Sequence, residues 1–188
     1  MTVPILSIMI LLPLAASVLS LFLSANGARW LALGTTTLLL ALGIDLWVSY
    51  DVGGAQWQFT EDVALFGSAF GWKLGIDGIA LMLIVLSVFL MPICILASWE
   101  SIDKRVPEYM AAFLLLEALM IGVFSAQDLF LFYIFFEAGL IPMYLIIGIW
   151  GGAERIYASY KFFLYTLLGS VLMLIAMMYM VVTAGTLK

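Results

Sequence analysis

The sequence has few of the residues that bind metals, cofactors or nucleotides. It contains no histidine and one cysteine, Cys94, among 188 residues. Haem, iron–sulfur and zinc sites need such ligands, and no glycine-rich phosphate loop is present, so we expect no cofactor or metal site in this chain. A single thiol cannot form an internal disulfide. Because Cys94 lies inside an apolar run, we interpret it as a small buried hydrophobic residue.

Charge is also scarce. Only 10% of the residues are charged, with 7 Lys and Arg against 12 Asp and Glu and a net charge of −5. The chain has no basic cluster, so we expect no nucleic-acid partner, and orientation in a membrane explains the few positive charges better.

Hydrophobic residues, in contrast, make up 66% of the sequence, which excludes a soluble globular domain. The apolar runs have a helical rather than an alternating pattern, which excludes a porin-like barrel. The predicted fold class is therefore all-α, a polytopic membrane helix bundle in a single membrane domain, 1–188.

Six membrane spans are predicted from apolar length and from the polar breaks between the runs. They cover approximately residues 3–23, 30–50, 77–98, 109–126, 129–150 and 160–183. The break between the fourth and fifth spans is so short that these helices should be antiparallel neighbours. The first span lacks a positive leader and a small-residue cleavage site, so we expect it to be retained as a membrane helix.

The positions of Lys and Arg predict the orientation, because short loops rich in positive charge stay on the cytoplasmic side. Only Lys73 and Lys188 fall on the outer side of the membrane. The other five fall on the cytoplasmic side: Arg29, Lys104, Arg105, Arg155 and Lys161. This count places the N-terminus outside, in a periplasm or an equivalent compartment.

The longest connection between spans is the segment 51–75, DVGGAQWQFTEDVALFGSAFGWKLG. Its glycines and scattered aromatic residues predict a short hairpin or an interfacial flap on the outer surface. We interpret Trp57 and Trp72 as anchors at the level of the lipid headgroups. Asp77 and Asp128 each directly precede an apolar helix, and both are predicted to be N-caps.

One acidic residue, Glu137, lies near the middle of the fifth apolar run. The run has about 22 residues and would extend roughly 33 Å as a helix. Glu137 follows Leu129 by eight residues, which puts its carboxyl roughly 12 Å below the Leu129 end, away from bulk water. Pro142 should kink the helix beside the acid. Tyr133 and Tyr144 share its face and could hydrogen-bond along a polar stripe. The acid is either a structural group tied to a neighbouring helix or a proton-handling group, and its depth favours proton handling.

Glu117 is the second acid inside a predicted span, about eight residues into the fourth. Because the fourth and fifth helices should be adjacent, Glu117 and Glu137 could lie close enough to share a proton. The alternative is that they face different neighbours and never interact.

Lys161 lies at the start of the last predicted span. Its side chain could simply snorkel to the interface, or it could be the cationic side of a proton path that begins in the cytoplasm. Deeper in the same helix, Thr166 and Ser170 could bond to helix carbonyls or join a polar seam. Gly169 beside Ser170 would allow a close helix approach.

Three stretches resemble a known family. They are FLFYIFFEAGLIPMYLIIGIWGG (130–152), YKFFLYTLLGSVLMLIA (160–176) and LGIDGIALMLIVLS (74–87). They are similar to the chain M family of bacterial proton-pumping NADH:quinone oxidoreductase, respiratory complex I, whose mitochondrial counterpart is subunit 4. The resemblance implies an antiporter-like fold of inverted repeats, each with a broken helix. This chain would supply the leading helices, 1–98, and the start of the first repeat, 109–188.

The resemblance also implies roles for individual residues. Glu137 matches the essential glutamate of the family's fifth helix, and Lys161 matches the lysine that opens the sixth. In the family, this glutamate pairs with a lysine on the broken helix, which follows the part of the subunit that corresponds to residues 1–188. Glu117 lies outside the matching motif, so its proposed part in proton transfer rests on its depth alone.

The function implied by the resemblance is proton translocation within complex I, in a bacterial inner membrane. The implied partners are other membrane subunits and the lipid bilayer, and this chain would carry no redox centre. NADH, FMN, iron–sulfur clusters and quinone would belong to the complex as a whole. The alternatives are a subunit of a multisubunit sodium/proton antiporter or membrane-bound hydrogenase, and a structural spacer whose acids hold helices together.

Overall fold

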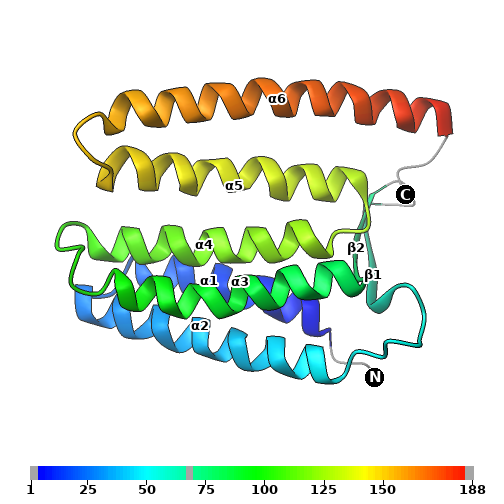
Figure 1. The fold of residues 1–188 in the computed structure, drawn as a ribbon, viewed down its shortest axis with the longest axis horizontal. Helices are drawn as coiled ribbons and strands as arrows, with labels where there is room; N and C mark the ends of the chain where they lie inside the picture. Colours follow the sequence, from blue (N-terminus) through cyan, green and yellow to red (C-terminus); the bar gives the residue numbers. More distant parts are fainter. Residues whose placement is uncertain (1–3, 67–69, 185–188) are drawn as a thin grey trace.

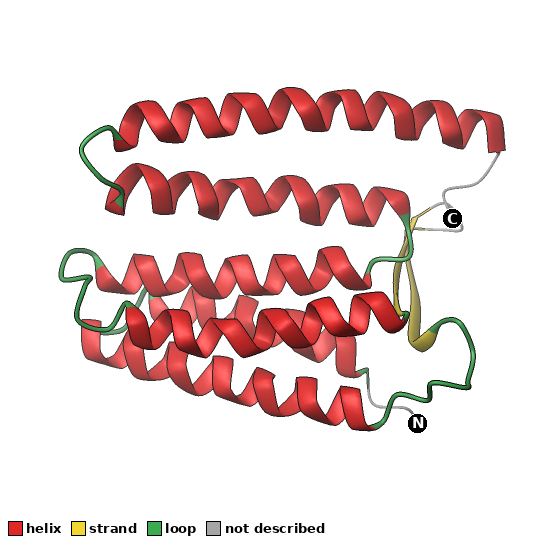
Figure 2. Ribbon diagram, viewed as in Figure 1, coloured by secondary structure: helices red, strands yellow, loops and turns green. Residues whose placement is uncertain are grey.

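The computed structural model describes residues 4–66 and 70–184. Within these residues the chain forms six helices and one β-hairpin (Figures 1 and 2). The elements are α1 (Ile5–Ser20), α2 (Ala25–Val48), β1 (Gln58–Phe66), β2 (Phe70–Ile76), α3 (Gly78–Ala97), α4 (Val106–Ser125), α5 (Leu129–Trp150) and α6 (Arg155–Ala184). The helices α2 to α6 are long and apolar enough to cross a membrane, and α1 is a shorter apolar helix of 16 residues. The predicted fold class is confirmed.

The helices are arranged in layers (Figure 1). α1 to α4 form a bundle in which α4 is central, because it contacts α1, α2 and α3 and also carries α5 on its outer side. α4 and α5 are antiparallel neighbours, as predicted. α6 packs on the far side of α5, and α5 is its only contact among the described elements. Among the described elements, α6 is therefore connected to the bundle by way of α5.

Close packing between α4 and α5 depends on a glycine. A Cβ added to Gly122 of α4 would lie 2.7 Å from two ring carbons of Phe135 on α5. Phe135 belongs to a buried apolar cluster that also contains side chains of α1, α2, α3 and β2. The absence of a side chain at Gly122 therefore lets α5 come close to the bundle.

The predicted hairpin is confirmed, and it closes one end of the bundle. Glu61 of β1 accepts hydrogen bonds from the backbone N–H of Leu6 at 2.8 Å and of Ser7 at 3.2 Å, and also from the Ser7 hydroxyl. These contacts satisfy free N–H groups in the first turn of α1. Trp72 of β2 donates through Nε1 to the Ser7 hydroxyl at 2.9 Å, and its ring packs edge-on against Phe135. Trp72 thus has a packing role that its interpretation as a headgroup anchor did not include.

Three helices begin earlier than predicted. α2 begins at Ala25, so Arg29 lies inside the helix rather than in the break before it. α4 begins at Val106 and includes Pro107, because a first-turn residue needs no N–H donor. α6 begins at Arg155 rather than near residue 160, which places Lys161 in its second turn. Polar residues at these ends indicated loops, but a helix that projects past the apolar zone leaves such residues in contact with water.

Several local predictions have definite outcomes. Both N-caps are confirmed: Asp77 accepts from the N–H of Ala80 at 2.7 Å, and Asp128 accepts from that of Phe130 at 2.8 Å. Cys94 is only half-buried, so its interpretation as a buried residue is wrong. It lies on a face of α3 that the other described helices only partly cover.

Gly169, predicted to allow a close helix approach, has no close neighbour among the described residues. Gly169 is exposed, and a Cβ there would meet nothing within 4 Å in the described structure. Gly169 lies on a face of α6 that α5 does not cover, so a close helix approach at this residue stays a prediction. α5 itself runs as one helix through Pro142, and the kink at that residue stays a prediction.

Candidate functional site

Glu137 lies midway along α5, and its carboxyl meets polar groups of α5 and α6. The hydroxyl of Tyr133, one turn earlier on α5, donates to Oε1 of Glu137 at 2.8 Å. The hydroxyl of Ser170 on α6 donates to the same oxygen. Ser170 is 3% exposed, and Glu137 is half-buried within this chain. The acid therefore has hydroxyl partners at the contact between two helices that are long enough to span a membrane.

The predicted polar stripe on α5 is confirmed for one tyrosine. Tyr133 bonds to Glu137, whereas the ring of Tyr144 packs against the rings of Tyr160 and Phe163 on α6, at centroid distances of 5.9 and 5.5 Å. Tyr144 thus contributes aromatic packing between the two helices, about two turns beyond Glu137.

The two hydroxyl residues of α6 behave differently. Thr166 donates to the carbonyl of Phe162 at 2.8 Å, within its own helix. Ser170 has a carbonyl partner of the same kind, Leu167 at 2.9 Å, and it also reaches Glu137 on α5. Bonding to helix carbonyls was predicted for both residues, and the seam between helices is formed by Ser170.

Glu117 lies in a different environment from Glu137. It is 0% exposed, on α4 in the interior of the bundle, and neither of its carboxyl oxygens has a hydrogen-bond partner among the described residues. The two acids are therefore not joined by a direct hydrogen bond in this structure. A proton shared over a longer distance stays a prediction.

The residues one turn to either side of Glu117 belong to two buried apolar clusters. Leu114 belongs to the same buried cluster as Ala32 of α2, and Ile121 belongs to the same cluster as Leu39 of α2. Thr36, which is fully buried, lies between Ala32 and Leu39 on α2. The Thr36 hydroxyl donates to the carbonyls of Ala32 and Leu33 on its own helix, at 3.0 and 3.1 Å.

Lys161 is exposed, and its ammonium lies 5.5 Å from the centre of the Tyr157 ring on the same helix. Ser170 follows nine residues later, about 13 Å further along the helix axis. Lys161 is thus too distant to pair with Glu137 directly. Of the three predicted site residues, the structure brings none into direct contact with another.

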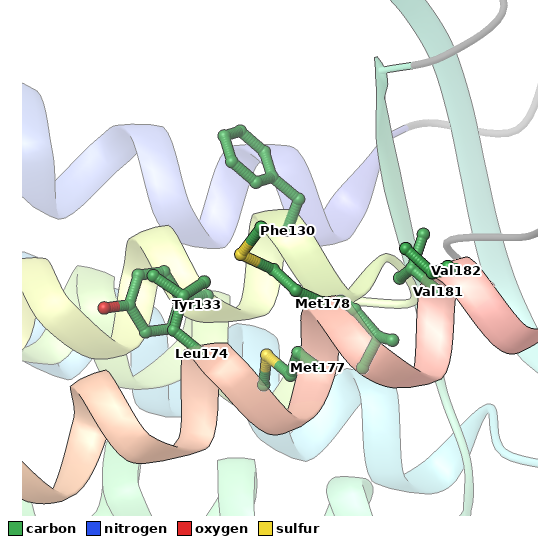
Figure 3. Close-up of a pocket in the computed structure, with 8 residues that line it drawn as sticks. Phe130, Tyr133, Leu174, Met177, Met178, Val181 and Val182 are labelled. Carbon is green, nitrogen blue, oxygen red and sulfur yellow. The ribbon is translucent and has the colours of Figure 1, made fainter.

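An apolar groove lies beside the site, between the first half of α5 and the second half of α6 (Figure 3). Its volume is about 180 Å³, and its lining includes Leu174, Met177, Met178 and Tyr133. Tyr133 is the polar residue of this lining, and the same hydroxyl bonds to Glu137. The groove escaped sequence analysis, because its two walls come from segments about 45 residues apart that carry no distinctive motif.

Two family models match consecutive parts of the chain. Residues 7–125 match the model described as NADH-ubiquinone oxidoreductase chain 4, amino terminus. Residues 126–188 match the model described as NADH:quinone oxidoreductase/Mrp antiporter, transmembrane. The boundary between the two matches coincides with the turn between α4 and α5.

Relatives of known sequence match nearly the whole chain. It is 53% identical over 188 residues to NADH-quinone oxidoreductase subunit M of Rhodobacter capsulatus, a match that covers 96% of this chain and 36% of that protein. It is 44% identical over 186 residues to NADH-ubiquinone oxidoreductase chain 4 of Arabidopsis thaliana, covering 96% and 38%. The chain thus spans just over a third of the length of these relatives.

Solved structures share the fold. Respiratory complex I from Thermus thermophilus with bound NADH contains a chain that superimposes with a TM-score of 0.82 at 28% identity, covering 96% of this chain and 36% of that one. The Mrp complex from a Dietzia species gives a TM-score of 0.81 at 17% identity, covering 97% and 20%. The second likeness concerns the fold alone.

Proposed function

The chain belongs to the family of NADH-ubiquinone oxidoreductase chain 4, and from this premise we propose that it is the leading part of a proton-translocating membrane subunit of respiratory complex I. Other subunits would transfer electrons from NADH to quinone, with FMN and iron–sulfur clusters as their cofactors. The partners of this chain would be the neighbouring membrane subunits and the lipid bilayer. We place it in a bacterial inner membrane with its N-terminus in the periplasm, as the distribution of Lys and Arg favours.

The environment of Glu137 carries this proposal. A carboxyl at this depth is stabilised in its ionised form by hydrogen-bond donors and by a nearby positive charge. Tyr133 and Ser170 supply two donors. The positive charge would come from a lysine on the broken helix that the family resemblance implies. Approach and withdrawal of that lysine would make Glu137 release and take up its proton.

Glu117 and Lys161 complete the proposed path. Glu117 is buried without a partner among the described residues, and an unpaired carboxylate is costly in such a place, so we assign it as a neutral acid that can pass on its proton. Lys161 lies in the second turn of α6, on the side that the positive charges mark as cytoplasmic. It would be the cationic group at the cytoplasmic end of the proposed path. Neither residue touches Glu137, so transfer between them would require bridging water.

The test is a carboxyl-to-amide substitution in the assembled complex. Glu137→Gln keeps the shape of the side chain, and its amide oxygen can still accept from Tyr133 and Ser170, so the helices should stay folded. We expect proton pumping per electron pair to be lost or sharply reduced. The measurement is the pH change in inverted membrane vesicles, with NADH oxidation followed in parallel.

Asp45→Asn is the matched control. Asp45 is an exposed acid on α2, and this substitution also replaces a carboxyl with an amide, away from the site. It should leave pumping intact. Unchanged pumping per electron pair in Glu137→Gln would remove Glu137 from the path and would favour a structural role for the acid.

A subunit of a multisubunit sodium/proton antiporter or a membrane-bound hydrogenase is the second candidate. The fold shared with the Mrp complex is the observation that favours it. Purification of the natural assembly separates the two candidates. Flavin-containing and iron–sulfur subunits in the purified assembly would support complex I, whereas membrane subunits alone would support the antiporter.

A further inference from the structure

Ser170 has one hydroxyl proton and two acceptors within reach. Its Oγ lies within hydrogen-bond distance of Oε1 of Glu137 and 2.9 Å from the carbonyl oxygen of Leu167. A serine hydroxyl carries a single proton and two lone pairs, so it donates fully to one acceptor at a time. The hydroxyl can therefore turn between the two acceptors without any movement of the helix backbone.

The carboxyl of Glu137 requires different partners in its two protonation states. When it is ionised, it only accepts, and the hydroxyls of Tyr133 and Ser170 both point at Oε1. When it is protonated, its own O–H needs an acceptor. The Oγ of Ser170 can accept that proton, because its own proton then has a place on the carbonyl of Leu167.

We infer that Ser170 is a positioning residue for Glu137, whose hydrogen bond to the acid reverses direction with each protonation. It donates to the carboxylate, and it accepts from the carboxylic acid while donating to Leu167. The inference rests on the proposed function, since it requires Glu137 to gain and lose a proton during turnover. Atoms and charge balance: Glu137 gains one proton from the path, one hydroxyl rotates, and no other bond forms or breaks.

The reversal links the proton on Glu137 to the attachment of α6. A hydrogen bond to an ionised acceptor is stronger than one between neutral groups. α6 packs against α5, so this bond is part of the contact between the two helices. The contact between α5 and α6 is therefore stronger when Glu137 is ionised and weaker when it is protonated.

Other ionisable groups lie on the elements that pack against α5. They include Glu117 on α4, Lys73 on β2, and Tyr160 and Lys161 on α6. None of them is hydrogen-bonded to Glu137 within the part of the chain that the structure describes. A change in the protonation state of Glu137 therefore directly affects its hydrogen bonds with Tyr133 and Ser170.

The experiment uses the full-length subunit in its complex and compares Ser170→Ala, Ser170→Thr and Thr166→Ala. The readouts are proton pumping per electron pair and the infrared C=O band of protonated Glu137, identified by its loss in Glu137→Gln. In Ser170→Ala we expect the band to move to higher wavenumber, because the acid loses a hydrogen-bond partner, and pumping to fall several-fold. Ser170→Thr, which keeps the hydroxyl, should restore both.

Thr166→Ala is the matched control, because Thr166 bonds only to a carbonyl of its own helix in this structure. It should change neither readout, and an equal change there would overturn the inference by showing general loosening of α6. If Glu137→Gln abolishes pumping but Ser170→Ala leaves band and pumping unchanged, the role of Ser170 falls while the proposed function stands. Should Ser170→Ala fail to assemble, Ser170→Cys supplies a weak donor of similar size, and an unmoved band in that variant is equally decisive.

Discussion

Gly122 allows α5 to lie close to α4, and replacing it with alanine should show how much that close contact contributes to stability. The added Cβ would lie 2.7 Å from Cγ and Cδ1 of the Phe135 ring and 2.8 Å from Cδ2. These distances are well below ordinary contact. The ring has little room to retreat, because Phe135 is 6% exposed and packs against Trp72 with ring centroids 5.7 Å apart. Either α5 moves away from α4 or the ring leaves its place against the hairpin.

The magnitude follows from two opposing effects. Overpacking of a buried contact costs about 1 to 3 kcal/mol. Alanine in place of a helical glycine regains up to about 1 kcal/mol through helix propensity. The free energy of unfolding should therefore fall by about 1 to 2 kcal/mol, which for a chain of this size corresponds to a melting temperature lower by about 3 to 6 °C.

The assay is heating of the detergent-solubilised protein, followed by size-exclusion chromatography to measure the fraction that remains monodisperse. Gly139→Ala is the control, since it makes the same change on α5, where a Cβ would meet nothing within 4 Å. That variant should melt at the same temperature as the original protein or slightly higher. If Gly122→Ala melts like the control, the spacing of α4 and α5 is not set by this contact and the reasoning is wrong.

Two further substitutions test the hairpin and the buried acid. Glu61→Ala should lower the free energy of unfolding by about 1 to 2 kcal/mol, because the N–H groups of Leu6 and Ser7 lose their acceptor. The measurement is hydrogen exchange, which should become faster in the first turn of α1. Asp62→Ala, at an exposed ion pair on the same strand, should cost under about 1 kcal/mol, and an equal loss in both variants would contradict the capping role. Glu117→Leu should raise the melting temperature, since it removes a buried carboxyl without partners among the described residues, and it should also reduce pumping; normal pumping would take Glu117 off the path.

The number and order of the helices could be predicted from the sequence because the membrane imposes them. A chain in hydrocarbon must satisfy its backbone hydrogen bonds within each span, so a long apolar run that crosses the membrane forms a helix. The ends were harder to predict. Residues 155–159 include charged and small side chains that indicate a loop, yet they form the first turn of α6. Near the interface a polar side chain is solvated in a helix as well as in a loop, so composition does not mark the boundary.

The candidate site divides in the same way. Tyr133 precedes Glu137 by four residues, and helical periodicity alone puts the two side chains together. Ser170 lies 33 residues from the acid, and its contact depends on the register between α5 and α6. That register is set by packing along the whole interface, including the rings of Tyr144 and Tyr160. No local sequence pattern specifies this register. The sequence therefore indicated that Ser170 could join a polar seam, but it could not identify Glu137 as its partner.

Glu117 and Glu137 occupy positions with different structural consequences. A change of charge at Glu117 acts inside a bundle in which α4 touches α1, α2 and α3, so any response has to repack several helices at once. A change of charge at Glu137 acts at the contact between α5 and α6, where its carboxyl accepts from Ser170. If both acids exchange protons, Glu117 is suited to hold a proton in a fixed place, and Glu137 is suited to change the hydrogen bond between α5 and α6 when a proton arrives. This division predicts that substitutions of Ser170 alter the coupling of pumping to electron transfer more than they alter stability, whereas substitutions of Glu117 alter stability as well.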